Sequence, residues 1–308
     1  MRRSLDAVLL LDKPAGISSN GALQQARRLF RAAKAGHAGT LDPLASGLLP
    51  VLFGEATKFS RFLLDSDKEY LADVQLGAGT STGDAEGEVT ARSAVDADGA
   101  RIEAALARFC GEIDQVPPMY SALKRNGRPL YELARRGVVI ARRPRRVVIR
   151  DIELLQRSGD LLRLRVRCSK GTYLRVLAED LGAALGTVAH LAALRRTAAG
   201  RFRLEQSVPL QLLGEMEEEA KQRLLMPVES LLQDLPCVQL DPGQVRSFLN
   251  GRPVAHASGP EGRCRVYGEG HELLGVGETG PAGELRPLRL LARAPHSSQA
   301  AEIPTKNL

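Results

Sequence analysis

The sequence predicts a protein of mixed helices and strands, with a large N-terminal part and a small, mainly β module after it. Alternating apolar residues over 162–168 are typical of a half-buried strand, and apolar residues at helical spacing follow over 174–185. After residue 233, an Asp-Pro-Gly helix start at 241–243 precedes three short strand-like segments, at 264–267, 273–277 and 285–291. This change of pattern predicts two structural parts.

The N-terminal part contains further expected elements. Residues 13–20 are typical of a loop that leads into a helix, because Leu23, Ala26 and Phe30 follow at helical spacing. Alternation over 70–76 predicts a strand, and the charge spacing over 215–223 predicts a solvent-facing helix. The remaining segments are expected to form a Gly- and Asp-rich loop at 77–100, a short helix at 102–109 and a proline-broken stretch at 116–124.

The stretch GHAGTLDPLASGLLP at 36–50 sets one carboxylate, Asp42, among glycines and prolines. Pro43 disfavours the helical conformation at Asp42, so the acid is expected on a loop. Loops on a rigid scaffold often carry catalytic groups, but an Asp before Pro is also a common turn former. On these residues alone the turn interpretation is favoured, and the catalytic one stays open.

The distribution of charge favours a polyanionic partner. The net charge is +7, and the segment 124–150 holds ten Lys or Arg residues against one acid, Glu132. A solvated helix face normally mixes both signs, so this segment resembles a phosphate-binding surface. A merely soluble basic loop is the alternative.

Several protein classes are disfavoured by the sequence. The four cysteines lie far apart without a C-x-x-C pair, and the five histidines lack H-E-x-x-H spacing, so we expect neither a disulfide framework nor a metal site. No apolar run approaches the roughly 20 residues of a membrane span, and the run Ala7–Leu11 is too short for a signal-peptide core. A cytoplasmic location without membrane attachment is therefore expected.

Five ordered motifs resemble the bacterial TruB family of tRNA pseudouridine synthases. They are LLLDKPAGISSN at 9–20, GHAGTLDPLASGLLP at 36–50, KFSRFLLDSDKEY at 58–70, VPPMYSALK at 116–124 and RCSKGTYLRVLAEDLG at 167–182. Family members often have Thr where this chain has Ala38, which leaves the neighbouring acid and histidine in place. One such motif would be weak, but five in the family's order make coincidence very improbable.

The resemblance implies an α+β pseudouridine synthase fold, in which a mixed, largely antiparallel sheet is flanked by helices around a central RNA-binding cleft. It implies a catalytic domain over 1–233 with a basic, flexible insertion at about 124–150, and a PUA-like RNA-binding module over 234–293. Residues 294–308 have little to bury and are expected to be a disordered tail.

The resemblance also assigns roles to residues. Asp42 would be the catalytic acid, Tyr70 would stack on the target uracil, and Arg175 would pair with Asp42. Tyr173 and Leu194 would line the pocket, and His37 would lie beside the flipped RNA loop. Lys13, Gly39 and Pro43 would support the catalytic loop, and the RNA backbone would be contacted by Lys124, Arg125, Arg142, Arg143, Arg145 and Arg146.

The implied activity is conversion of the uridine at tRNA position 55, in the T loop, to pseudouridine. No cofactor is implied, and the protein is expected to act as a monomer on tRNA, contacting the T stem-loop and, through the C-terminal module, the acceptor stem. Asp42 could act as a nucleophile at C1′, on the uracil ring, or as a base. Two alternatives are an RNA-binding tRNA-folding chaperone with incidental catalysis and a hydrolytic nucleosidase.

Overall fold

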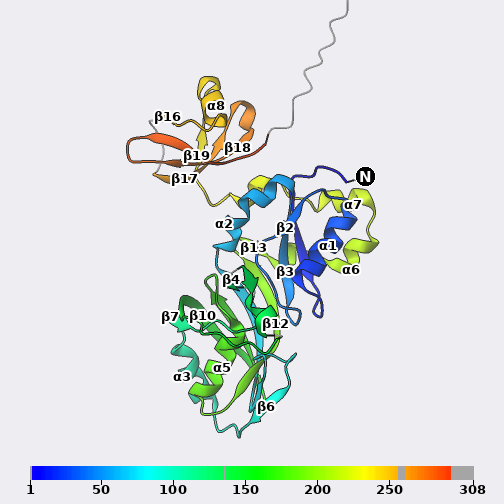
Figure 1. The fold of residues 1–308 in the computed structure, drawn as a ribbon, viewed down its shortest axis with the longest axis vertical. Helices are drawn as coiled ribbons and strands as arrows, with labels where there is room; N and C mark the ends of the chain where they lie inside the picture. Colours follow the sequence, from blue (N-terminus) through cyan, green and yellow to red (C-terminus); the bar gives the residue numbers. More distant parts are fainter. Residues whose placement is uncertain (1, 122, 126, 135, 256–260, 293–308) are drawn as a thin grey trace, which may run out of the picture. The chain divides into compact units, whose positions relative to one another are not determined.

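The protein has the α+β architecture expected from the sequence. A computed structural model describes residues 2–121, 123–125, 127–134, 136–255 and 261–292. The chain divides into two compact units, Met1–Leu231 and Leu232–Leu308 (Figure 1).

A sheet of ten strands forms the centre of the first unit. Its main path runs β14-β1-β3-β12-β4-β11-β10-β7, with β13 attached to β12 and β2 attached to β3. The pairs β1–β14 and β3–β12 are parallel and the other neighbours are antiparallel, which confirms the mixed, largely antiparallel sheet. The strands are β1 (Ala7–Lys13), β2 (Ala35–His37), β3 (Ser46–Phe53), β4 (Lys68–Leu76), β7 (Gly111–Gln115), β10 (Arg145–Ser158), β11 (Leu161–Cys168), β12 (Ala189–Ala199), β13 (Phe202–Arg203) and β14 (Val208–Pro209).

Helices cover this sheet in two groups. The helices are α1 (Ser19–Leu29), α2 (Ser60–Leu64), α3 (Gly99–Ala107), α4 (Leu130–Ala134), α5 (Leu174–Ala184), α6 (Leu210–Glu215) and α7 (Glu218–Arg223), with 3-10 turns at Gly54–Phe59, Leu204–Gln206 and Val228–Leu231. One core cluster joins α1 and α6 to β1 and β3 around Phe30. The other joins α3 and α5 to β4, β11 and β12 around Leu181 (Figure 1). Burial of these apolar faces holds the central strands in register.

Two sequence-based expectations about this unit were wrong. The segment 77–100 is not only loop, because β5 (Ala78–Thr80) and β6 (Val89–Arg92) form a small antiparallel sheet. The expected insertion at 124–150 ends earlier than predicted, because 145–149 pair with β7 inside β10. Its arginine-rich composition concealed the strand: Val147 and Ile149 face the core while the arginines beside them are exposed. Within the segment, β8 (Lys124–Arg125) and β9 (Arg128–Pro129) form a short hairpin.

The second unit has the helix and the three strands expected from its sequence. Its elements are β15 (Cys237–Gln239), α8 (Pro242–Leu249), β16 (Val254–Ala255), β17 (Gly262–Tyr267), β18 (Leu273–Thr279) and β19 (Glu284–Leu290), with a 3-10 turn at Glu269–His271. Asp241 caps α8 by accepting a hydrogen bond from the backbone N–H of Gln244. Phe248, Val266 and Leu285 belong to its own hydrophobic core. The expected tail, 294–308, lies outside the described residues.

Among the described residues, no helix is both long and apolar enough to cross a membrane.

Gly47 allows β3 and β12 to approach closely. It lies at the start of β3, opposite Arg196 of β12, and its φ of 101° is in the left-handed region. A Cβ at this position would lie 2.3 Å from the carbonyl oxygen and 2.7 Å from the backbone nitrogen of Arg196. Because no side chain fits there, glycine is required where the 36–50 stretch enters the sheet.

We predict that Gly47→Ala destabilises the protein by at least about 3 kcal/mol, since backbone strain and a backbone clash add together. Gly16→Ala is the matched control: Gly16 also has a positive φ, of 84°, but a Cβ there would meet no heavy atom within 4 Å. It should cost only about 1–2 kcal/mol, the strain of the left-handed conformation. Denaturant unfolding of both variants measures the difference, and equal losses would contradict the clash.

Candidate active site

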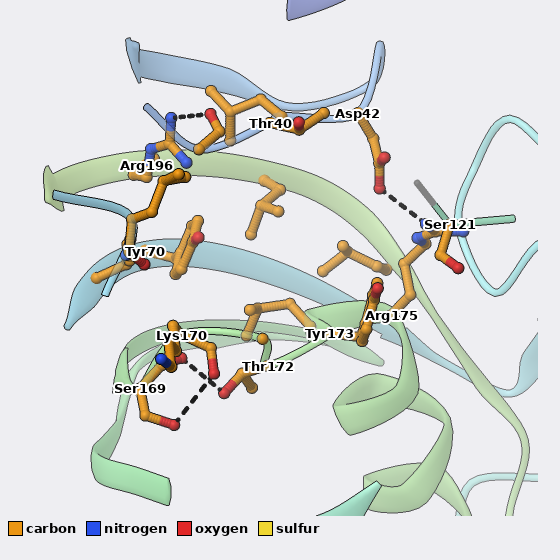
Figure 2. A pocket seen from close by; sticks show the side chains of 18 residues that line it. Thr40, Asp42, Tyr70, Ser121, Ser169, Lys170, Thr172, Tyr173, Arg175 and Arg196 are labelled. Carbon is orange, nitrogen blue, oxygen red and sulfur yellow. Dashed lines mark hydrogen bonds and ion pairs between the residues drawn. The ribbon is translucent and has the colours of Figure 1, made fainter. Parts of the chain in front are cut away.

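A cavity of about 240 Å³ collects most of the residues expected to bind substrate. It lies where the loop 39–45, β4, the β11–α5 connection and β12 meet (Figure 2). Asp42, Tyr70, Tyr173, Arg175 and Leu194 all line it. Residues from four separate parts of the sequence thus meet around one space.

An ion pair between Asp42 and Arg175 lies in the wall of this cavity. Nη2 of Arg175 is 2.9 Å from Oδ2 of Asp42, and a dashed line marks this pair in Figure 2. The side chain of Arg175 is only 5% exposed, whereas that of Asp42 is 45% exposed. The arginine is therefore fixed by its surroundings, and the carboxylate remains accessible to a ligand.

The buried end of Arg175 is held by several further acceptors. Its Nε lies 3.5 Å from Oδ2 of Asp84, whose side chain is also 5% exposed. Its terminal nitrogens donate hydrogen bonds to the carbonyl oxygens of Thr82, at 3.2 Å, and Tyr120, at 2.7 Å. These contacts leave the guanidinium little freedom, so they fix the direction in which Nη2, which also donates to Tyr120, faces Asp42.

Hydrogen bonds from the 13–20 region hold the backbone on both sides of Asp42. Ser19, the first residue of α1, accepts a hydrogen bond from the N–H of Leu41 at 2.7 Å and lies 2.9 Å from that residue's carbonyl oxygen. The N–H of Gly16 donates to the carbonyl oxygen of Pro43 at 2.8 Å. The N–H of Ala45 donates to the carbonyl oxygen of Asp42 at 3.1 Å, so Asp42 begins a turn, as its sequence favours, and this turn is fixed from a second segment.

The side chain of Lys13 supports the backbone of the segment 14–17, which contacts the loop that carries Asp42. It is fully buried and donates hydrogen bonds to the carbonyl oxygens of Pro14 and Ile17, at 2.9 and 2.7 Å. Burial lowers the pKa of Lys13 to about 8, although the nearby carboxylates of Asp42 and Glu86 act in the opposite direction. Lys13 and Pro43 do not line the cavity, whereas Gly39 does.

His37 is not brought into the cavity with the other expected residues. It ends β2, is half-buried, and its Nδ1 has no hydrogen-bond partner among the described residues. Burial, with a smaller effect from Arg196, lowers its pKa, so the neutral form is favoured.

The two tyrosines present aromatic surfaces to the cavity (Figure 2). Burial raises the pKa of both Tyr70 and Tyr173, so each keeps its hydroxyl proton at neutral pH. The positive charge of Arg196 acts in the opposite direction on the pKa of Tyr70, with a smaller effect. A flat base can lie against such a ring.

The residues expected to contact the RNA backbone differ in their surroundings. Arg142 donates a hydrogen bond to the carbonyl oxygen of Pro117 at 3.2 Å, and Arg146 lies 3.4 Å from Glu112 and 3.8 Å from Asp114. Arg143 and Arg145 are exposed. The side chains of Lys124 and Arg125 lie outside the described residues. The positive charge of Arg146 is therefore partly balanced within the fold, by Glu112 and Asp114.

Matches to three family models decide the classification of the chain. Residues 27–174 match the TruB family pseudouridylate synthase N-terminal domain, 175–233 the tRNA pseudouridylate synthase B C-terminal domain, and 236–291 the Pseudouridine synthase II TruB C-terminal model. The chain belongs to the TruB family of pseudouridylate synthases.

Curated relatives match over nearly the full length of this TruB family chain. Proteins named tRNA pseudouridine synthase B from Dechloromonas aromatica and Azoarcus sp. (strain BH72) are 56% and 55% identical to it. The matches cover 95% and 94% of this chain, and 97% and 96% of the relatives.

Solved structures support the same fold. A chain in an H/ACA RNP bound to a substrate RNA containing 2′-deoxyuridine matches with a TM-score of 0.70 and 26% identity, over 93% of this chain and 85% of that one. A chain in a Cbf5-Nop10-Gar1 complex matches with a TM-score of 0.70 and 27% identity, over 94% and 84%.

Asp42 is the one acidic residue among the described residues that line the cavity of this TruB family member. No group of three or more His, Cys, Asp or Glu side chains in the described part of the chain could hold a metal ion. The carboxylate of Asp42 lies beside the buried Arg175, in a cavity that Tyr70 and Tyr173 also line. Such a carboxylate can stabilise positive charge on a sugar, attack a carbon, or accept a proton.

Three residues with special surroundings at or beside the cavity were missed by sequence reasoning: Asp84, Lys68 and Arg196. Asp84 lies in the segment 77–100, which the sequence predicts to be a loop. Lys68 is buried, and its Nζ donates to the carbonyl oxygens of Leu63, Leu64 and Ser66 at the end of α2. For Lys68 a signal existed, because it shares the alternation that places Tyr70 on the inner face of β4.

We predict that Arg175→Met lowers stability by about 3 kcal/mol, the usual cost of breaking a buried ion pair, because it leaves the Asp84 carboxylate buried without its cation. Adding Asp84→Asn to this variant should recover part of the loss, since an amide carries no charge. Thermal and denaturant unfolding of the single and double variants test this. A double variant no more stable than Arg175→Met would show that Asp84 does not depend on Arg175.

Proposed function

We propose that this protein is an isomerase that converts the uridine at position 55 of tRNA, in the T loop, to pseudouridine. The observation that supports this most strongly is the ion pair of an accessible Asp42 with a buried Arg175, inside an aromatic-lined cavity of a TruB family chain. The relatives that match over nearly the full length are named tRNA pseudouridine synthase B.

The reaction needs no external reactant. The N1–C1′ bond of uridine breaks, the uracil rotates, a C5–C1′ bond forms, and the proton on C5 is lost while one is gained at N1. Atoms and electrons balance without hydrolysis or redox change. One ionised carboxylate near C1′ and the ring therefore suffices as the reactive protein group.

Asp42 performs that role. Its side chain is accessible from the cavity, so a nucleotide can reach it, and Arg175 holds it by a charge-assisted hydrogen bond. Arg175 is itself fixed by Asp84 and by the carbonyl oxygen of Tyr120. It therefore holds the carboxylate of Asp42 in one direction and does not move with it. Attack at C1′, attack on the ring, and proton removal all require this placement.

Tyr70, Tyr173 and Leu194 hold the flipped base. A uridine must leave its stack to reach Asp42, which costs a few kcal/mol. Stacking on Tyr70 returns part of this, since base–aromatic stacking contributes about 1–3 kcal/mol. His37, at the end of β2 outside the cavity, lies beside the RNA loop from which the base has been flipped, and Gly39, Pro43 and Lys13 maintain the loop.

The two structural units have separate roles in catalysis and in RNA binding. Residues 1–233 form the catalytic domain, and the arginines at 142, 143, 145 and 146, with Lys124 and Arg125, contact the RNA backbone. Residues 234–293 form a PUA-like module that binds the acceptor stem. The protein acts in the cytoplasm, as a monomer, without a cofactor.

The direct test is to incubate the purified protein with transcribed, prefolded tRNA and map pseudouridine at single-nucleotide resolution. Pseudouridine at position 55 and no free uracil is the expected result. Free uracil in solution would instead mark a hydrolytic nucleosidase, and tRNA refolding without modification would mark a chaperone.

We predict that changing Arg142, Arg143, Arg145 and Arg146 together to Gln weakens tRNA binding and flattens its salt dependence. For each phosphate that the variant no longer neutralises, the slope of log affinity against log salt should fall by roughly 0.7–0.9. Single-turnover chemistry on saturating tRNA should change little, because none of the four residues lines the cavity.

A matched control removes the same charge elsewhere in the sheet: Arg157, Arg163, Arg165 and Arg167, all exposed on β10 and β11, are changed to Gln. Binding and salt slope should then stay closer to those of the wild type. Equal effects in both sets would show that only net charge matters, not a contact at 142–146.

A further inference from the structure

Arg196 occupies a central position in the sheet beneath the cavity. It belongs to β12, the strand between β4 and β3, and pairs with Tyr70 on one side and Gly47 on the other. Side chains of directly paired residues project from the same face of a sheet, so Arg196 shares a face with Tyr70. It is also only 1% exposed.

The guanidinium of Arg196 joins the two ends of the segment that carries Asp42. Its Nε donates to the carbonyl oxygen of Leu48 at 2.7 Å, and its Nη2 donates to that of Gly39 at 3.0 Å. Figure 2 shows this side chain between Tyr70 and the loop that carries Thr40 and Asp42. A planar group with several donors in fixed directions can span two such acceptors.

The contact with Gly39 is close because that residue has no side chain. Its φ is 99°, and a Cβ there would lie 3.2 Å from Nη1 of Arg196. The glycines at 39 and 47 therefore let one arginine reach the backbone at both ends of the loop.

Arg196 has no carboxylate within 4.0 Å in the part of the chain that is described, so its buried charge is balanced by dipoles. The carbonyl oxygens of Leu48 and Gly39 accept its protons, and its charge acts on the neighbouring Tyr70, whose pKa it lowers against the larger effect of burial. Burying a cation without a counter-ion is unfavourable, and an apolar residue would usually stabilise such a position at least as well. Stability alone therefore does not account for an arginine here.

We propose that Arg196 is a positioning residue for the reaction at Asp42. It fixes the ends of the segment 39–48 relative to Tyr70, and so sets where the carboxylate stands relative to a base stacked on that ring. This inference rests on the proposed function but assigns a task to a residue that does not touch the reacting atoms. Arg175 aims the carboxylate from one side of the loop, and Arg196 anchors the loop itself.

The test compares Arg196→Lys with the wild type. Lysine keeps the charge but offers one compact donor group that cannot span both carbonyls. The single-turnover rate on saturating tRNA should fall about 10- to 100-fold, since a displacement of about 1 Å costs up to about that factor. Affinity for tRNA should change less than about threefold, since phosphate contacts dominate it.

Arg163→Lys is the control, because Arg163 lies in the same sheet but pairs with Asp73 at 2.8 Å on an exposed surface. Its rate and affinity should match those of the wild type. The wild-type assay distinguishes a failure of the proposed function from a failure of this inference. If the wild type forms no pseudouridine, the proposed function fails. If the wild type forms pseudouridine and Arg196→Lys keeps the full rate, only the inference about Arg196 fails.

A second readout distinguishes positioning from general stability. Tyr70→Phe keeps the ring but removes the hydroxyl, on whose pKa the charge of the directly paired Arg196 acts. If Arg196 couples Tyr70 to the loop, the rate losses of Tyr70→Phe and Arg196→Lys should be less than multiplicative in the double variant. The proposal would be overturned by multiplicative losses in the double variant, or by equal losses of rate and affinity. It would also be overturned if neither Arg196→Lys nor Arg196→Met folded.

Discussion

The ion pair between Asp42 and Arg175 is the interaction on which the site depends. A lone carboxylate on a surface loop can turn freely and is well hydrated, so it stabilises charge on a substrate poorly. Here the cation is buried and fixed by Asp84 and two carbonyl oxygens, while the anion remains accessible. The protein therefore holds the direction of the carboxylate through its partner instead of burying the carboxylate itself.

The rest of the fold supplies what this pair needs. Ser19 and Gly16 hold the backbone beside Asp42, and Arg196 holds the ends of the loop. These contacts come from α1, from the segment before it and from β12. The closely approaching strands β3 and β12 require glycine at 47, and the glycine at 39 leaves room for the guanidinium of Arg196. Preorganisation of this kind limits the reorganisation needed during the reaction.

Much of this could be predicted from the sequence, and the failures have physical causes. Strand alternation and helical spacing gave β11 and α5, and the motifs indicated that Asp42, Tyr70 and Arg175 meet, which they do around one cavity. Arg195 and Arg196 are adjacent and identical in type, yet Arg196 is buried and Arg195 is not. Their difference in burial follows from the pairing of β12 with β3 and β4, which only the folded structure shows. The start of β10 was missed because its exposed arginines resemble a surface loop.

The central claim is that the loop exists to aim the charge of Asp42. Asp42→Asn keeps the size of the side chain and removes that charge, so single-turnover pseudouridine formation and tRNA affinity on one preparation test the claim most directly. Turnover should fall by several orders of magnitude while affinity remains, because phosphate contacts and stacking on Tyr70 do not require the carboxylate. Turnover like that of the wild type would contradict the account, and loss of binding together with turnover would show that the loop has a structural role.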